Sequence, residues 1–186
     1  MLACQRICRR SIFSFLPRPP FLGGGGSTRI HAKRHGERAL LGYSPEQLFD
    51  VVIDVDSYAE FIPWCSGSKI LKRNPDNTMN AELKIGFKPF EERYTSHISY
   101  ARPRVVYVNV QEGRLFHHLK TEWVFSEGPK PNSCDLNFSV DFAFASVLHQ
   151  RVAEMFFHEV SSTMTSAFEK RCRAVYGKPS LTMRTL

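Results

Sequence analysis

Several features that would mark a particular class of protein are missing from this chain of 186 residues. No apolar run approaches the roughly 20 residues that a membrane-spanning helix needs. No P-loop, G-x-S-x-G or G-x-G-x-x-G pattern occurs, and the sequence offers no candidate catalytic residue. These absences argue against a membrane-spanning protein and against the common nucleotide-binding and hydrolase classes. Any contact with a membrane is expected to be peripheral.

Cysteine and histidine patterns also exclude several kinds of site. Cys4 and Cys8 lie near the start of the chain, and Cys65, Cys134 and Cys172 are odd in number and widely spaced. Because no C-x-x-C pair exists, neither a zinc site nor a disulfide framework is indicated. The seven His form no metal-binding motif. We therefore predict neither a metal ion nor a cofactor.

Acidic residues are missing from the first 35 positions, where seven of the 25 Arg and Lys residues lie. An Arg-rich start without acids, apolar between its charges, is the pattern of a mitochondrial transit peptide. The rest of the chain balances 18 basic against 18 acidic residues, which removes most of the compositional support for nucleic-acid binding. A Pro-rich piece followed by GGGGS at 23–27 predicts a linker over residues 17–28. We predict a transit peptide and linker at 1–33, one folded domain at 34–178 and a tail at 179–186.

Two short helices are expected at the start of this domain. The segment SPEQ at 44–47 combines a Ser cap, a Pro suited to the first helical position and a Gln that completes a capping box. Asp56 or Ser57 is expected to cap a second helix that runs through Phe61. Pro63 ends that helix because proline cannot continue it.

The middle of the chain predicts strands. Apolar and polar residues alternate in ELKIGF, LKTEWVF and DLNFSVDFAF, while RYTSHISY and VVYVNV are rich in β-branched and aromatic residues. In residues 135–144 the apolar face consists of Leu136, Phe138, Val140, Phe142 and Phe144. Such alternation indicates a sheet with one apolar face, and the short turn-rich connections imply antiparallel neighbours.

The last element is a long amphipathic helix from about Val147 to Tyr176. Its apolar residues recur at steps of three and four, and Gly177 and Pro179 end it. At 1.5 Å per residue it is roughly 45 Å long. The order is therefore one strand, two short helices, about six antiparallel strands and one long helix. We predict an α+β fold in which a curved antiparallel sheet of about seven strands wraps around that helix and leaves an elongated apolar cavity.

This order of elements resembles the helix-grip fold of the START, Bet v 1 and polyketide-cyclase-like superfamily. Four stretches are similar to the mitochondrial coenzyme Q-binding protein family: GYSPEQLFDVVIDVDSYAEFIPWC, ELKIGFKPFEERYTS, GRLFHHLKTEWVF and FFHEVSSTMTSAFEKR. The resemblance implies non-enzymatic binding of ubiquinone by a lipid chaperone or carrier that supports respiratory electron transport and ubiquinone biosynthesis. It also implies a peripheral place on the matrix side of the mitochondrial inner membrane. Respiratory or quinone-biosynthesis complexes are then expected partners, and nucleic acid is not.

The resemblance points to Leu83 and Trp123 as residues of a ligand pocket. The wider set of candidate ligand-binding residues shares an apolar face of a strand or of the long helix, where each side chain serves either as core or as cavity wall. It consists of Leu83, Ile85, Phe87, Trp123, Phe138, Val140, Phe142, Phe156 and Val160. Ligand cavities are mostly apolar with few polar anchors, and a buried Trp123 indole N–H needs a partner.

Large apolar residues also gather at the junction after the first helix. Tyr58, Phe61, Ile62 and Trp64 precede the cation Lys69. Apolar wedges beside cations suit the mouth of a cavity that docks on an anionic bilayer. The same residues could equally cap the end of the barrel.

Two other functions remain open on the same fold. One is an interaction protein of the mitochondrial ribosome, which the balanced charge of the body disfavours. The other is an aromatic cyclase-type enzyme acting on a polyketide-like substrate.

Overall fold

The computed structural model describes residues 32–87, 90–111, 114–146 and 163–186. The first half contains β1 (Lys33–Leu41), α1 (Pro45–Ile53), the 3₁₀ turn η1 (Val55–Ser57) and α2 (Tyr58–Phe61). Six strands follow: β2 (Cys65–Arg73), β3 (Thr78–Phe87), β4 (Phe90–Ala101), β5 (Val105–Gln111), β6 (Phe116–Glu127) and β7 (Cys134–Phe144). Residues 163–176 are helical, and we call them the C-terminal helix. The short strand β8 (Arg184–Thr185) comes last.

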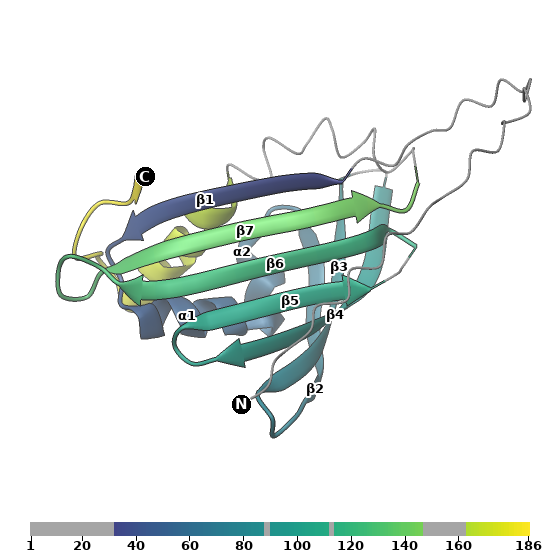
Figure 1. The fold of residues 1–186 in the computed structure, drawn as a ribbon, viewed down its shortest axis with the longest axis horizontal. Helices are drawn as coiled ribbons and strands as arrows, with labels where there is room; N and C mark the ends of the chain where they lie inside the picture. The colour runs from purple at the N-terminus through teal and green to yellow at the C-terminus, as the bar shows by residue number, and fades with distance from the viewer. Residues whose placement is uncertain (1–31, 88–89, 112–113, 147–162) are drawn as a thin grey trace, which may run out of the picture.

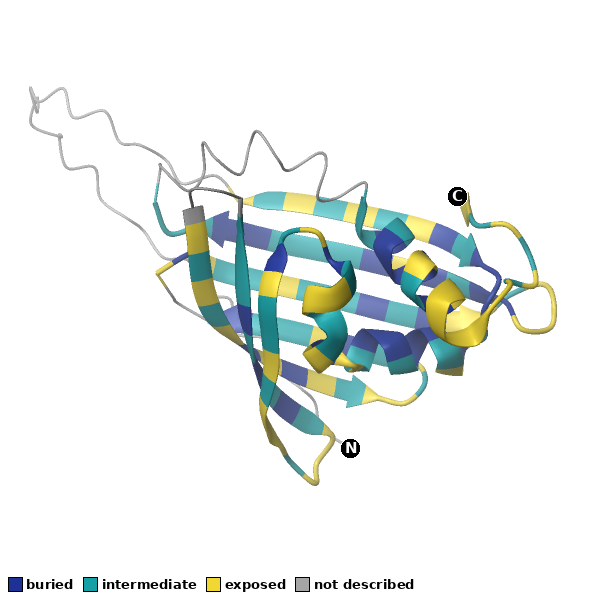
Figure 2. Ribbon diagram, turned by 180° about the vertical axis from the view of Figure 1, so that it is seen from behind, coloured by how far each residue is buried: buried dark blue, intermediate teal, exposed yellow. Residues whose placement is uncertain are grey.

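All the strands form one antiparallel sheet in the order β2-β3-β4-β5-β6-β7-β1-β8. The sheet curves strongly, so that β2 and β3 cross the direction of β1 and β7 (Figure 1). Figure 2 shows α1, α2 and the C-terminal helix on one face of the sheet. The predicted α+β helix-grip architecture is confirmed. No helix within the described residues is long and apolar enough to cross a membrane.

The start of α1 has the predicted capping box. The Ser44 hydroxyl accepts a hydrogen bond from the Gln47 backbone N–H at 3.3 Å, and the Gln47 side chain accepts one from the Ser44 N–H at 3.0 Å. Pro45 occupies the first turn. These bonds satisfy two of the donors that a helix start leaves open. Leu48 and Val52 are then buried against the sheet.

The predicted side-chain cap of the second helix is wrong. Neither Asp56 nor Ser57 caps α2, because the backbone of Ser57 is itself helical, with φ −86° and ψ −4°, rather than extended. The Asp56 carboxylate instead accepts a hydrogen bond of 2.6 Å from the backbone N–H of Ile70 in β2. The acidic residue therefore fastens η1 to the edge of the sheet.

The end of the C-terminal helix lies where the sequence predicts it. Gly177 follows Tyr176 with φ +82°, and its N–H donates to the Arg173 carbonyl at 3.0 Å. Glycine adopts this left-handed conformation without the strain that a Cβ would bring. The predicted start of the helix near Val147 lies outside the described residues.

The segment after the helix adds an eighth strand that the sequence did not predict. Arg184 and Thr185 pair with Leu40 and Ala39 of β1. Earlier in the same segment, the Ser180 N–H donates a hydrogen bond to the carbonyl of Gly42 at 2.9 Å. A strand of two residues is too short to show a period of two, which explains why the pattern of the sequence did not reveal it.

The buried residues form two clusters. The larger lies between α1, the C-terminal helix and the middle of the sheet, and includes Phe49 and Phe168. The smaller one is built from Val110, Leu115, Phe116 and Phe142. Three partly buried residues pack against both clusters: Ile85, Tyr94 and Val140. These three side chains mark the region where the candidate site lies.

Candidate functional site

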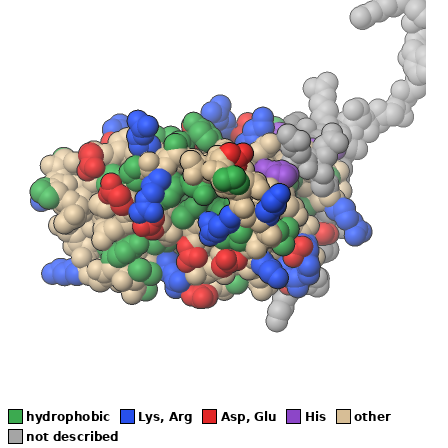
Figure 3. Space-filling view, turned by 90° about the horizontal axis from the view of Figure 1, so that it is seen from below, with side chains coloured by type: hydrophobic (Ala, Val, Ile, Leu, Met, Phe, Trp, Pro, Cys, Tyr) green, Lys and Arg blue, Asp and Glu red, His purple; other side chains and the backbone are tan. Residues whose placement is uncertain are grey.

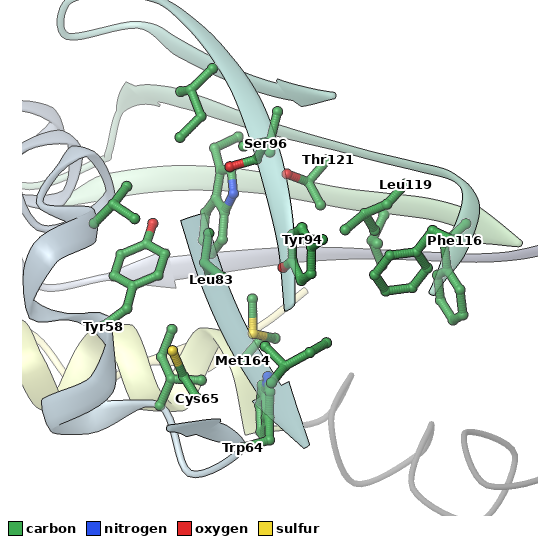
Figure 4. A pocket seen from close by; sticks show the side chains of 18 of the residues that line it. Tyr58, Trp64, Cys65, Leu83, Tyr94, Ser96, Phe116, Leu119, Thr121 and Met164 are labelled. Carbon is green, nitrogen blue, oxygen red and sulfur yellow. The ribbon is translucent and has the colours of Figure 1, made fainter. Parts of the chain in front are cut away.

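A cavity of about 220 Å³ lies between the sheet and the helices, and most of its lining is apolar. Strands β2 to β7 supply Cys65, Leu83, Ile85, Tyr94, Ser96, Ile98, Val108, Phe116, Leu119, Thr121, Trp123, Phe138, Val140, Phe142 and Phe144. The helical side supplies Val55, Tyr58, Ile62, Trp64, Met164 and Phe168. Figure 4 shows these side chains converging from the sheet and from α2.

The volume decides what the cavity can hold. An engineered cavity of about 150 Å³ binds benzene, whereas pockets for drug-sized ligands span roughly 300 to 1,000 Å³. A cavity of about 220 Å³ therefore accommodates one substituted ring. As described, this cavity is smaller than those that enclose drug-sized ligands.

Six of the predicted ligand-binding residues line this cavity: Leu83, Ile85, Trp123, Phe138, Val140 and Phe142. The remaining three, Phe87, Phe156 and Val160, cannot be placed, because the Phe87 side chain and residues 147–162 lie outside the description. The structure thus brings together all the candidates whose side chains it describes. That they bind a ligand stays a prediction.

The predicted mouth residues divide into two groups. Tyr58, Ile62 and Trp64 line the cavity, whereas Phe61 does not and Lys69 is exposed on β2. Ile62 is only 5% exposed. In this structure α2 is therefore part of the cavity wall. Ile62 could contact a bilayer only if α2 moved.

Other lining residues were not among the candidates, and β6 and β7 show why. Counting back in twos from Trp123 gives Thr121 and Leu119, which do line the cavity, and then His117, which is exposed. A register shift between Phe116 and His118 turns Phe116 inward instead. The alternation could have found Leu119, Thr121 and Phe144, but a bulge is not visible in it.

Three polar side chains border the cavity without a partner. Among the residues that the structure describes, none makes a hydrogen bond with the Tyr94 hydroxyl, the Thr121 hydroxyl or the Trp123 indole N–H. Tyr94 and Thr121 project into the same space from β4 and β6 (Figure 4). Burial raises the pKa of Tyr94, so its hydroxyl keeps its proton at neutral pH. The wall therefore offers polar anchors of the kind that orient a ligand.

The other polar groups of the described lining either already donate a hydrogen bond or are weak hydrogen-bonding groups. The Tyr58 hydroxyl donates to the Val52 carbonyl at 2.5 Å, and the Ser96 hydroxyl donates to the Ala81 carbonyl at 3.1 Å. Burial raises the pKa of the Cys65 thiol. Within the described part of the chain, no group of three His, Cys, Asp or Glu side chains could hold a metal ion.

The fold and its cavity define a helix-grip protein of the START and polyketide-cyclase-like class. The Zhui aromatase/cyclase from Streptomyces sp. R1128 matches with a TM-score of 0.67 at 16% identity, over 78% of this chain and 96% of that one. A START superfamily protein from Mycobacterium smegmatis matches with a TM-score of 0.65 at 17% identity, over 76% and 98% of the two chains. At such identities these similarities show the fold alone.

Sequence similarity is more specific. The model of the family described as polyketide cyclase / dehydrase and lipid transport matches residues 41–169. The coenzyme Q-binding protein COQ10 homolog B, mitochondrial, of Xenopus laevis is 44% identical over 155 residues, and the coenzyme Q-binding protein COQ10, mitochondrial, of Drosophila melanogaster is 38% identical over 152. The chain belongs to this family and, within it, to the mitochondrial coenzyme Q-binding proteins. The resemblance noted in the sequence is thereby confirmed.

The alignments with these two relatives cover most of this chain but a smaller share of the relatives themselves. The two alignments cover 82% and 81% of this chain, which in turn spans 62% of the length of each of these relatives. A second kind of relative also matches, the ribosome association toxin RatA of Rickettsia prowazekii. It is 32% identical over 139 residues, which make up 73% of this chain and 93% of that protein.

Proposed function

We propose that this protein binds ubiquinone by holding the benzoquinone ring in the cavity. The observation that carries the proposal is a cavity of about 220 Å³ whose apolar wall presents three polar groups, on Tyr94, Thr121 and Trp123, that have no hydrogen-bond partner within the part of the chain that the structure describes. A benzoquinone ring has apolar faces and two carbonyl oxygens that accept hydrogen bonds. Its shape and polarity therefore match the wall, and two relatives that are named coenzyme Q-binding proteins support the same ligand.

The binding is proposed to be non-enzymatic. Acid–base catalysis needs a group that can exchange a proton near neutral pH within reach of the substrate. The described lining contains no carboxylate, imidazole or amine, and burial raises the pKa of its one thiol, Cys65. This composition suits a protein that carries a quinone. It does not suit the cyclase-type enzyme that the fold also hosts.

The isoprenoid tail is proposed to leave the described cavity. A volume of about 220 Å³ holds a ring and little more, so most of a long tail lies against other surfaces. We propose that the protein works as a lipid chaperone or carrier on the matrix side of the mitochondrial inner membrane. There it would exchange ubiquinone with the bilayer and with respiratory or quinone-biosynthesis complexes, after residues 1–33 direct it to the organelle as a transit peptide.

One experiment tests the binding directly. The segment 34–186, which keeps β8, is purified, extracted with organic solvent and examined by mass spectrometry for ubiquinone. A cavity-filling variant, Val140→Phe, is compared with Val124→Phe, which adds the same ring to the opposite face of the sheet, beside Trp123. Wild type and Val124→Phe are expected to retain ubiquinone and Val140→Phe to lose it. Equal ubiquinone content in all three, with equal thermal stability, would refute the assignment.

A ribosome-associated role is the second candidate, because a protein named ribosome association toxin RatA is 32% identical to this chain. The balance of 18 basic and 18 acidic residues beyond position 35 argues against it, since binding to RNA phosphates depends on positive charge. Acidic and basic side chains are interspersed on the face shown in Figure 3. Co-sedimentation of the segment 34–186 with mitochondrial ribosomes at moderate salt would favour the ribosomal role.

A further inference from the structure

Each of the three unpartnered polar groups of the described cavity wall can donate a hydrogen bond, and one of them cannot accept one. The indole N–H of Trp123 can only donate. Burial raises the pKa of Tyr94, which keeps its hydroxyl proton available for donation. The Thr121 hydroxyl can do either. These three residues come from two strands, β4 and β6, and all line the same cavity, in which Figure 4 shows Tyr94 and Thr121.

Strong acceptors are scarce on the same wall. Among the described lining residues there is no carboxylate, no carboxamide and no imidazole. The hydroxyls of Tyr58 and Ser96 already donate to the carbonyls of Val52 and Ala81, and their oxygens can still accept a hydrogen bond. The neighbouring thiol of Cys65 is a weak acceptor. The described wall therefore contains one group that can only donate a hydrogen bond, the Trp123 indole, and its acceptors are neutral hydroxyl oxygens and one thiol.

The two redox states of ubiquinone differ in this respect. The oxidised ring presents two carbonyl oxygens, which only accept hydrogen bonds. The reduced ring presents two hydroxyl groups, each of which must also donate. A donor taken out of water without an acceptor carries a free-energy cost that a satisfied acceptor does not.

Resting on the proposed function, we infer that the cavity distinguishes the redox states of its ligand and holds the oxidised quinone more tightly than the quinol. Trp123 and Tyr94 are the specificity-determining residues, through the donors they direct at the ring. The dissociation constant of the oxidised form is expected to be at least tenfold lower. Because binding and reduction are linked, a tenfold preference lowers the midpoint potential of the bound two-electron couple by about 30 mV. The protein then protects its cargo from reduction, and reduction promotes release.

The test measures both redox forms against one protein. The probe is ubiquinone with two isoprene units, oxidised or fully reduced beforehand, in anaerobic equilibrium dialysis with the segment 34–186. The variants are Trp123→Phe and Tyr94→Phe, which remove one donor each and keep an aromatic ring. Tyr107→Phe is the matched control, because that hydroxyl is on the exposed side of β5 beside Glu122.

Wild type and Tyr107→Phe are expected to prefer the oxidised form at least tenfold. Each of the other two variants is expected to lose about fivefold in affinity for the oxidised form and to keep its affinity for the quinol. Equal binding of both forms by wild type, or a full preference in both cavity variants, overturns the inference and leaves ubiquinone binding intact. Binding of neither form by a folded wild-type protein instead refutes the proposed function.

Discussion

At the scale of single residues, burial sets the chemistry of the cysteines. Cys134 in β7 and Cys172 in the C-terminal helix are fully buried, and neither is part of a disulfide. Burial raises the pKa of each thiol to about 12. Both thiols are thus neutral at physiological pH and poor nucleophiles.

These thiols predict a loss of stability at alkaline pH. In the unfolded chain a thiol has an ordinary pKa of 9.0, so it ionises well before the folded one does. The contribution of these raised pKa values to the free energy of unfolding is complete below pH 9. It is lost as the pH rises from 9 toward 12, and the loss at pH 10 is on the order of 1 kcal/mol per thiol. Urea unfolding at pH 8 and pH 10 is expected to show a smaller pH-dependent loss for Cys172→Ala than for wild type. Parallel curves for the two proteins would contradict this.

The individual lining residues show how far the sequence reaches. Alternation in two strands was enough to place Leu83, Trp123 and Val140 on one face, because a period of two follows from the geometry of the strand. Tyr94 was missed because its inward neighbours include the polar Ser96, which breaks the apolar pattern. Alternation also tells which face a residue lies on. It cannot tell whether other side chains fill the space in front of that face.

At the scale of elements, one side of the cavity is closed by a contact between α2 and the C-terminal helix. The Arg171 guanidinium pairs with the Glu60 carboxylate at 2.9 Å and lies over the Phe61 ring, 5.5 Å from its centroid. Phe168 meets the rings of Tyr58 and Phe61 edge to face at 5.4 and 5.2 Å. Because Tyr58 and Phe168 also line the cavity, separating these two elements would open it.

Removing this contact is predicted to speed ligand exchange. Arg171→Ala loses the ion pair and the cation–π contact together, which at a partly exposed site amounts to about 1 kcal/mol. Transfer of ubiquinone from the loaded protein to vesicles is expected to accelerate about threefold to tenfold, with little change in thermal stability. Arg173→Ala is the matched control, since Arg173 pairs with Glu169 in its own helix. Equal transfer rates for both variants would argue that α2 does not gate the cavity.

The second element-scale feature is the tail that ends in β8. A Cβ at Gly42 would lie 2.4 Å from the Leu181 carbonyl oxygen and 2.8 Å from the Pro179 Cβ, whereas a Cβ at Gly36 would meet its nearest neighbour at 3.8 Å. The tail therefore packs so closely against Gly42, the residue after β1, that only glycine fits at this position.

Gly42→Ala is predicted to displace the tail or to cost about 1 to 3 kcal/mol of stability, the range typical of overpacking. Hydrogen exchange of the Ser180 and Leu186 amides, which donate to Gly42 and Arg38, is expected to accelerate. Gly36→Ala should leave both amides protected. Unchanged exchange in Gly42→Ala would show that the tail tolerates the added methyl group.

The elements themselves were largely predictable. Helix α1 carries an explicit capping box, and β3, β6 and β7 carry alternating patterns, so each element has a local signal that agrees with the fold. Helix α2 was predicted with its end at Phe61 but with the wrong cap, whereas β8 has two residues, too few to show any period. Their positions depend on contacts with Arg171 and with β1, which are far away in the sequence.

At the scale of the whole molecule, the decisive quantity is the cavity volume, which no sequence pattern encodes. A curved sheet around a helix suggested an elongated cavity for both ring and tail. The described cavity, at about 220 Å³, is sufficient for the ring. On the proposed function, the described cavity would hold the ring of ubiquinone and leave most of its tail outside.

This separation predicts how affinity depends on tail length. An enclosed tail would gain about 0.8 kcal/mol per buried CH₂ group, or more than tenfold in affinity for every isoprene unit. If the tail leaves the cavity, the gain stops after the first unit. Dissociation constants for ubiquinones with one, two and three units, referred to free monomer in equilibrium dialysis, are expected to differ by less than about fivefold. Val140→Phe should weaken all three equally, since it competes with the shared ring. A tenfold gain at each added unit would mean instead that the molecule encloses the tail.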